Sequence, residues 1–172
     1  MRTEKVIVLP YQSSWKEDFL QLKQMIEALV GPWILSIEHV GSTAVEGLSA
    51  KPIIDIDVVM SDEAALGQIV QKLAEVGYQH EGNLGIEGRE AFRYEPRTDW
   101  PLHHLYVCSP DSQELHRHLT FRNYLRMHPE AVKEYSLVKE RAATQFPSDI
   151  DGYMASKASC IEKMYHACGL EP

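Results

Sequence analysis

The sequence has few cysteines and no long hydrophobic run. Its three cysteines, Cys108, Cys160 and Cys168, are odd in number and show no Cys-x-x-Cys spacing, which argues against a disulfide framework and a zinc knuckle. No stretch approaches the ~18 consecutive apolar residues that a membrane-spanning helix needs. The first residues form too short an apolar stretch for a secretory signal peptide. We therefore expect a cytoplasmic protein with reduced thiols and no membrane partner.

Basic residues are also scarce, because 17 Lys and Arg face 25 Asp and Glu, for a formal charge of −8. This balance opposes stable binding to nucleic acid or to an anionic membrane. The basic charge is uneven, since seven of the eight arginines lie in residues 87–172. The asymmetry favours acidic groups in the first half that hold a cation and arginines in the second half that hold an anion, although solvated surface charge gives the same bias.

The length of 172 residues fits one domain, spanning 1–172. Hydrophobic spacing predicts strands at 5–9, 34–40, 52–60, 78–81, 90–95 and 102–108. It predicts helices at 14–31, with a Ser14 and Glu17 capping box, and at 62–76, between a Ser61 cap and a Gly77 stop. From Asp111 the pattern is helical, with breaks at Pro129 and Pro147. Because strands precede helices, we expect an α+β fold. Its mixed sheet covers about 34–108, with helices on one face and a C-terminal helical segment over about 111–168.

Two carboxylates alternate with apolar residues in the strand Ile54-Asp55-Ile56-Asp57-Val58. Side chains alternate faces along a strand, so Asp55 and Asp57 lie ~7 Å apart on one face. Two carboxylates there repel each other unless a hard divalent cation lies between them. Mg²⁺ takes one or two carboxylates together with water and substrate phosphate oxygens. The pair therefore predicts a magnesium site.

A small-residue turn, Gly41-Ser42-Thr43, ends the preceding strand. Free backbone N–H groups and small side chains in such a turn let a phosphate approach closely, and Lys51 could add positive charge. A solvated strand face beside an ordinary Gly-Ser turn is the alternative interpretation. The order and spacing of the turn and the carboxylates together favour a nucleotide site.

Several cations fall on inward faces of the predicted elements. Arg122 and Arg126 share the helical stripe of Leu115 and Leu119, and Lys157 lies within the apolar face of Ile150, Met154, Ile161, Met164 and Cys168. Such cations need a buried carboxylate or a ligand in a cleft. We expect Arg122 and Lys157 to close over the aspartate pair, and Arg93 and Arg126 to contact phosphate. Structural salt bridges are the alternative for each.

Histidines offer a further set of possible ligands. His103, His104, His116 and His118 lie close in sequence without a His-Glu-x-x-His spacing. Because His116 and His118 are two apart on a helix, they cannot share one face. We expect no dedicated zinc site, and we expect His39 and His104 near the aspartate pair as ligands or their supports.

The Gly-Ser turn followed by Asp-Ile-Asp resembles the DNA polymerase beta-type nucleotidyltransferase superfamily. A longer set of motifs resembles the GrpB family of bacterial proteins within it. These motifs are His39-Val-Gly-Ser-Thr-Ala-Val-Glu-Gly-Leu, Ala50-Lys-Pro-Ile-Ile-Asp-Ile-Asp, His104-Leu-Tyr-Val and Phe121-Arg-Asn-Tyr-Leu-Arg, with Tyr11, Trp15, Phe19 and His128-Pro-Glu. The resemblance covers nearly the whole chain.

The resemblance implies that Gly41 and Ser42 contact nucleotide phosphates and that Asp55 and Asp57 ligate a metal. The superfamily usually takes a third carboxylate from a later strand, where this chain offers His104 and Tyr106. Glu95 on the neighbouring strand could substitute. With His104 as the third ligand, the site could prefer Mn²⁺ or Zn²⁺ to Mg²⁺.

Three functions remain open at this level. One is a metal-dependent nucleotidyltransferase that uses a nucleoside triphosphate and a small-molecule acceptor. The second is a non-catalytic module that binds a nucleotide or phosphorylated metabolite. The third is a metal-dependent phosphohydrolase that uses the same residues with water as acceptor.

Overall fold

The computed structural model describes residues 5–94 and 99–171. Five strands, β1 (Ile34–Val40), β2 (Ile54–Met60), β3 (Tyr78–Gly82), β4 (Arg89–Tyr94) and β5 (His103–Cys108), are accompanied by five α-helices. The helices are α1 (Ser14–Val30), α2 (Leu66–Ala74), α3 (Gln113–Met127), α4 (Pro129–Gln145) and α5 (Ile150–Ala167). Short 3₁₀ turns precede β1 (η1, Gly31–Trp33), follow it (η2, Ser42–Ala44) and precede α2 (η3, Glu63–Ala65). The predicted α+β class is confirmed.

The strands form one mixed sheet in the order β1-β2-β5-β4-β3. Strands β2 and β5 are parallel, whereas the other neighbouring pairs are antiparallel. The register places Asp55 beside His104 and Asp57 beside Tyr106, and Tyr106 in turn lies beside Ala91 of β4. On the other side of β2, Glu38 of β1 lies beside Asp57, so four strands contribute side chains to the sheet face that carries both aspartates.

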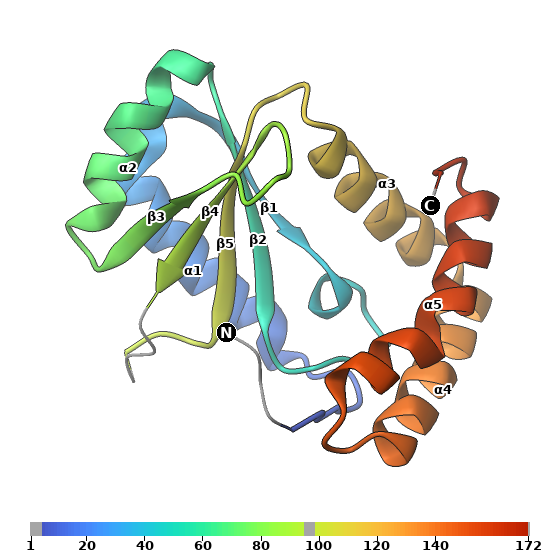
Figure 1. Cartoon of the computed structure of the whole chain (residues 1–172). Coiled ribbons are helices and arrows are strands. Elements are labelled where there is room, and N and C mark those ends of the chain that lie inside the picture. The colour runs from blue at the N-terminus through green and yellow to red at the C-terminus, as the bar shows by residue number, and fades with distance from the viewer. Residues whose placement is uncertain (1–4, 95–98, 172) are drawn as a thin grey trace.

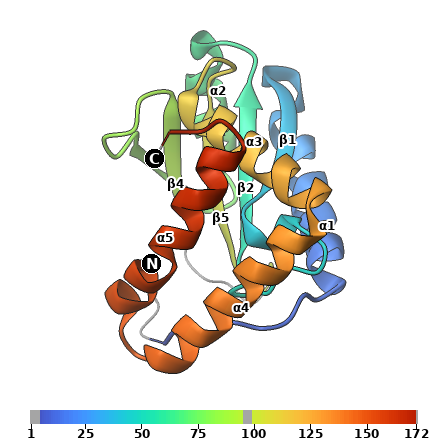
Figure 2. The same ribbon diagram turned by 90° about the vertical axis from the view of Figure 1, so that its right-hand side faces the viewer.

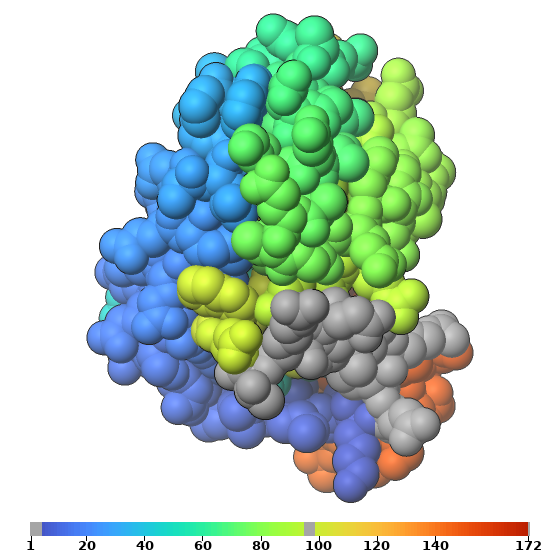
Figure 3. Space-filling view, turned by 90° about the vertical axis from the view of Figure 1, so that its left-hand side faces the viewer, coloured from blue at the N-terminus to red at the C-terminus, as the bar shows by residue number. Residues whose placement is uncertain are grey.

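Helices α1 and α2 cover the opposite face of the sheet (Figure 1). The buried side of α1 recurs at helical spacing through Trp15, Phe19, Leu22, Ile26 and Val30. These side chains pack against Ile54, Ile56, Val58, Leu105 and Val107 of the central strands. In the space-filling view of this side, blue atoms of α1 and green atoms of α2 lie over the strands (Figure 3). The alternation predicted for β2 is thus confirmed.

Helices α3, α4 and α5 lie on the aspartate side of the sheet, with α5 running in front of the strands and α4 beside it (Figure 2). Leu115 of α3 packs over Val59 and Cys108, so this face is apolar at one end and polar beside the aspartates. Within the described residues, no helix is long and apolar enough to cross a membrane.

Several local predictions need correction. Residues 5–9 form only a single bridge, between Leu9 and Ala50, because their recorded backbone partners, Ala50 and Pro147, lie outside the strands. Ser14 is the first residue of α1 and no side chain caps that helix. Asp62, one residue after the predicted Ser61, caps the turn before α2 by accepting from the Ala65 N–H. The breaks at Pro129 and Pro147 are confirmed.

The buried face of α5 is also displaced from the prediction. Tyr153, Cys160 and Met164 are buried, whereas Met154 is 49% exposed. Lys157 still lies on the buried side because it falls at helical spacing between Tyr153 and Cys160. Glu95, the last residue of the strand predicted at 90–95, lies outside the described residues.

One buried histidine links β1 to both α1 and the η2 turn. The His39 ring stacks on Phe19 with 4.5 Å between centroids, and its Nε2 lies 2.9 Å from the Thr43 hydroxyl. Burial lowers the pKa of His39 to about 4, assisted by the charges of Arg126 and Arg122 and opposed by Asp55. The folded state therefore holds a neutral imidazole that the unfolded chain would protonate near pH 6.5.

We expect His39 to make the protein less stable as pH falls. Because the unfolded chain binds the proton first, stability is complete above about pH 6.5 and declines toward about pH 4. The full loss is about 3 kcal/mol. Urea unfolding across this range should give a flatter pH profile for His39→Gln than for the wild type. Parallel profiles would show that His39 does not carry this dependence.

Candidate functional site

The turn after β1 lies directly against the first aspartate. Gly41 adopts φ +74°, and a Cβ atom at this position would collide with Asp55 Oδ2 and lie 3.1 Å from Asp55 Cγ. Only glycine combines this left-handed backbone with so close an approach. Ser42 then opens the η2 turn, where Thr43 is buried against His39. The predicted juxtaposition of turn and carboxylate is present.

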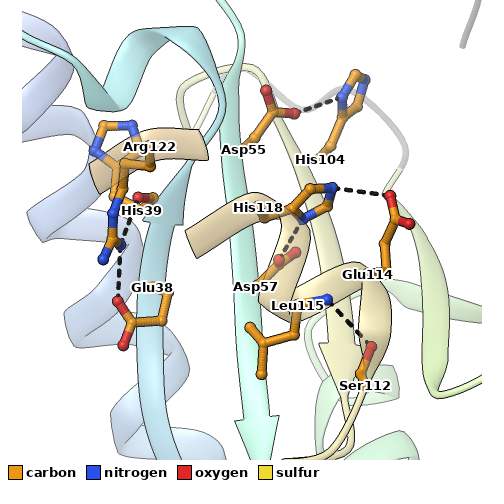
Figure 4. A network of polar contacts seen from close by, with 10 residues as sticks. All are labelled: Glu38, His39, Asp55, Asp57, His104, Ser112, Glu114, Leu115, His118 and Arg122. Atoms are coloured by element: carbon orange, nitrogen blue, oxygen red, sulfur yellow. Dashed lines mark hydrogen bonds and ion pairs between the residues drawn. The ribbon is translucent and has the colours of Figure 1, made fainter. Parts of the chain in front are cut away.

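The second aspartate is completely buried and is held by helix α3 (Figure 4). His118 Nδ1 lies 2.5 Å from Asp57 Oδ2, and its Nε2 lies 3.1 Å from Glu114 Oε1. Burial alone would lower the pKa of His118, but the hydrogen bond and charge of Asp57 and the charge of Glu114 outweigh it and raise the pKa. Two carboxylates facing two ring nitrogens favour the imidazolium form. Asp57 Oδ1 has no hydrogen-bond partner among the residues that the structure describes.

Asp55 is one-third exposed, and its Oδ1 lies 3.0 Å from His104 Nδ1 (Figure 4). Among residues 5–94 and 99–171, no three His, Cys, Asp or Glu side chains are arranged to hold a metal ion by themselves. The buried, unpartnered oxygen of Asp57 and the exposed oxygens of Asp55 nevertheless fit a hard cation whose remaining ligands come from phosphate and water. The flanking imidazoles also suit Mn²⁺.

Three lysines converge near Ser42 and Asp55. Lys139 of α4 is 3% exposed, donates to Ser42 Oγ and lies 3.3 Å from the Ser49 carbonyl oxygen. Lys51 and Lys157 lie over the Tyr153 ring, each 4.8 Å from its centroid. In the described part of the chain, none of the three pairs with a carboxylate. Together they form a cationic cluster, which we call the lysine cluster.

The lysine cluster is held in a strained electrostatic state. Burial lowers the pKa of Lys157 to about 8, with Lys51 adding to the effect and Asp55 opposing it. Burial, followed by the charge of Lys157, holds the pKa of Lys139 well below its usual value. Burial likewise lowers the pKa of Lys51. A polyanion bound here would favour the charged, ammonium form of all three lysines and would raise their pKa.

The predicted arginines are engaged in different ways. Arg122 donates to Glu38 at 2.9 Å and to the His39 carbonyl oxygen at 3.1 Å. Arg126 donates through two nitrogens to the Ala44 carbonyl oxygen, at 3.0 and 2.8 Å. These contacts brace β1 and the η2 turn, and a phosphate role for either arginine stays a prediction. Arg93 is exposed on β4, opposite Gln79 of β3.

Two residues of the site escaped the sequence analysis. Lys139 follows Val132 and Tyr135 at helical spacing and precedes Ala142, so the argument applied to Lys157 would have found it. His118 was set aside because it could not share a face with His116. The structure uses it without His116, pairing it instead with Glu114 one turn earlier, an i, i+4 relation that is visible in the sequence.

Comparison with solved structures defines the class of fold. The chain resembles GLD-2 in the GLD-2/RNP-8 complex with a TM-score of 0.61 and 12% identity, over 95% of this chain and 63% of that one. It resembles Cid1 in complex with its product ApU with a TM-score of 0.55 and 13% identity, over 78% and 42% of the two chains. The fold is therefore nucleotidyltransferase-like.

The chain belongs to the GrpB family, because the family model described as "GrpB protein" matches residues 5–167. The crystal structure of the conserved protein GrpB from Enterococcus faecalis superposes with a TM-score of 0.83 and 34% identity, over 94% of this chain and 96% of that one. The glutamate-rich protein GrpB of Alkalihalophilus pseudofirmus is 30% identical over 93% of this chain and 94% of its own length. The protein YqkA of Bacillus subtilis is 35% identical over 92% of this chain, which spans 46% of YqkA.

Substitution of Gly41 tests the close approach to Asp55. Gly41→Ala should destabilise the protein by about 2–4 kcal/mol, since it adds a steric clash to the cost of a left-handed backbone. Gly82→Ala is the matched control, because Gly82 has φ +76° and open space around it. It should cost only about 1 kcal/mol. Equal losses in urea unfolding would mean that the contact with Asp55 imposes no constraint.

Proposed function

We propose that this protein is a metal-dependent nucleotidyltransferase acting on a nucleoside triphosphate and a small-molecule acceptor. The observation that carries the proposal is the arrangement around Asp55: the Gly41 turn packs against it, Asp57 follows it in β2, and the lysine cluster faces it. This arrangement offers one place for a cation and an adjacent place for a polyphosphate. The nucleotidyltransferase-like fold supports the same reaction class.

The chemistry requires positioning and charge more than a nucleophilic side chain. A divalent ion, Mg²⁺ or Mn²⁺, would be held by Asp55 and Asp57 and would supply Lewis-acid stabilisation of phosphate charge. The hydroxyl of Ser42 and the backbone N–H groups of the η2 turn bind the distal phosphates, while Lys51, Lys139 and Lys157 neutralise them. The acceptor oxygen bonds to the α-phosphorus, pyrophosphate leaves with the electron pair of the broken bond, and the acceptor proton passes to solvent.

A non-catalytic nucleotide-binding module is the second candidate. The observation favouring it is that β5 presents His104 and Tyr106 beside Asp55 and Asp57, with no carboxylate at either position. A module of this kind would keep the cation and the phosphate contacts without efficient transfer. A phosphohydrolase would use the same contacts with water as acceptor.

Nucleotide binding should depend on both metal and Asp55. A nucleoside triphosphate at ~100 times its dissociation constant adds ~2.7 kcal/mol of stability, which raises the melting temperature by several degrees in a domain of this size. We expect this thermal shift with Mg²⁺ or Mn²⁺, a much smaller one with chelator, and none for Asp55→Asn. Glu27→Gln on the outer side of α1 serves as the control and should behave like the wild type.

Product analysis separates the three functions. Incubation with each nucleoside triphosphate, Mn²⁺ and mixed small alcohols should release pyrophosphate and label the acceptor. Release of orthophosphate alone would identify a phosphohydrolase, and saturable binding without either product would identify the binding module. A wild-type protein that shows no shift with any nucleotide would contradict the proposal itself.

Replacement of Lys139 should separate stability from binding. Lys139→Met removes a buried amine that is costly to desolvate, so the free protein should unfold at an equal or higher urea concentration. Nucleotide affinity should fall roughly tenfold or more, because a charge-assisted phosphate contact is lost. Lys163→Met, at a side chain 71% exposed on α5, provides the control and should leave binding unchanged. Loss of stability with retained affinity would assign Lys139 a structural role.

A further inference from the structure

Arg89 is the first residue of β4 and lies on the sheet face that carries the aspartates. Its backbone pairs with Cys108 of β5, and Cys108 pairs with Val59 of β2. Side chains alternate along each strand, so Arg89 shares its face with Ala91 and Tyr106, and through them with Asp57. A half-buried guanidinium is therefore present two strands away from the metal-binding strand.

The donors of Arg89 are largely unused. Its guanidinium carbon lies 4.5 Å from the centroid of the Tyr106 ring, and its Nε is buried without a hydrogen-bond partner in residues 5–94 and 99–171. Within the described residues it takes part in no ion pair, in contrast to Arg122, which has Glu38. A buried, unsatisfied donor on a charged group is costly, and the cost is removed when a ligand accepts its hydrogen bonds.

The surroundings of Arg89 leave room for an anion in electrostatic terms. Asp57 and Glu114, the acidic groups on the α3 side, both bond to His118, which offsets their charge. Glu81 of β3 also acts on Tyr106, but its side chain is exposed, so solvent screens its charge. Burial raises the pKa of Tyr106 even though Arg89 opposes the rise, so the phenol stays neutral. Helix α3 begins beside Gly88, where a Cβ would lie 3.1 Å from Ser112 Cβ, and its positive end adds to the guanidinium charge.

The position of Arg89 in the sheet suggests which reactant would carry the anion. The Gly41 turn follows β1, on one side of β2, whereas β5 and β4 lie on the other side. In phosphoryl and nucleotidyl transfer, the attacking and leaving oxygens lie roughly in line through phosphorus. If the distal phosphates leave toward the Gly41 turn, the acceptor approaches from the side of β5 and β4. Tyr106 lies beside Asp57 on that side, and Arg89 reaches over the Tyr106 ring from the row of Cys108 and Val59.

We propose that Arg89 binds an oxyanion, a carboxylate or phosphate group, on the small acceptor. That this ligand is an acceptor rests on the proposed function, but the oxyanion site itself can be tested without nucleotide. The planar guanidinium of Arg89 suits two parallel hydrogen bonds to a carboxylate or phosphate group. Stacking on the Tyr106 ring holds the plane of the guanidinium in place.

The test is a titration of the full-length, nitrogen-15-labelled chain with glycerol 3-phosphate, glycerate and glycerol, followed by NMR. Glycerol 3-phosphate or glycerate should shift the backbone amide signals of Arg89, Ala91 and Tyr106, whereas glycerol should not. Whichever anion shifts them identifies the group as phosphate or carboxylate. Arg89→Gln should weaken this binding roughly tenfold or more. Arg117→Gln, which alters another arginine lying over a tyrosine ring, should change it less than about twofold.

Three outcomes would overturn the inference: shifts confined to Ser42 and the lysine cluster, equal shifts with glycerol, or unchanged affinity in Arg89→Gln. A nucleotide titration of the wild type in parallel distinguishes this result from failure of the proposed function. Oxyanion binding at Arg89 in a wild-type protein that binds no nucleotide would retain the site and reject the transferase. Nucleotide binding without any effect at Arg89 would retain the transferase and reject the anionic acceptor.

Discussion

A carboxylate buried in a central strand is the constraint on which the rest of the site depends. Asp57 is 0% exposed, and the fold meets its charge by bringing His118 across the sheet on α3. That requirement fixes α3 over β2 and β5, with Leu115 covering Val59 and Cys108. An apolar residue of similar volume would cost less at this position, yet one oxygen of Asp57 is buried and has no partner within the described part of the chain. Stability alone does not account for an arrangement of this kind, whereas a site that gains its last ligand on binding does.

The sign of the charge reverses between the whole chain and the site. The sequence carries a formal charge of −8, but Lys51, Lys139 and Lys157 gather beside Asp55 without carboxylate partners in the described structure. Burial is the first cause of the lowered pKa of all three lysines, and neighbouring lysines add to the effect for Lys139 and Lys157. The net negative charge therefore disfavours binding of an extended polyanion such as nucleic acid, whereas the local lysine cluster suits a compact phosphate group.

The sequence was most informative where one element sufficed. Alternation along β2 placed Asp55 and Asp57 on the face away from the core, and the Gly41 turn was found because β-strand ends and small residues are readable locally. Contacts between distant elements were less accessible. The partner of Asp57 comes from a helix 61 residues later, and no periodicity encodes that distance. Arg122 was correctly placed on an inward face, but the sequence could not distinguish Glu38 from a phosphate as its partner.

Strand β5 lies between β2, which carries the aspartates, and β4, which carries Arg89, so its side chains affect both metal binding and acceptor binding. At the two positions of β5 nearest the aspartates, this chain has His104 and Tyr106. A carboxylate there would lie between the aspartate pair and β4, and it would repel any anion that approached Arg89. A neutral phenol and an imidazole that contacts Asp55 impose no such repulsion. The residues at these two positions of β5 therefore bear on both proposals, because an oxyanion on the acceptor would meet no carboxylate of β5 on its way to Arg89.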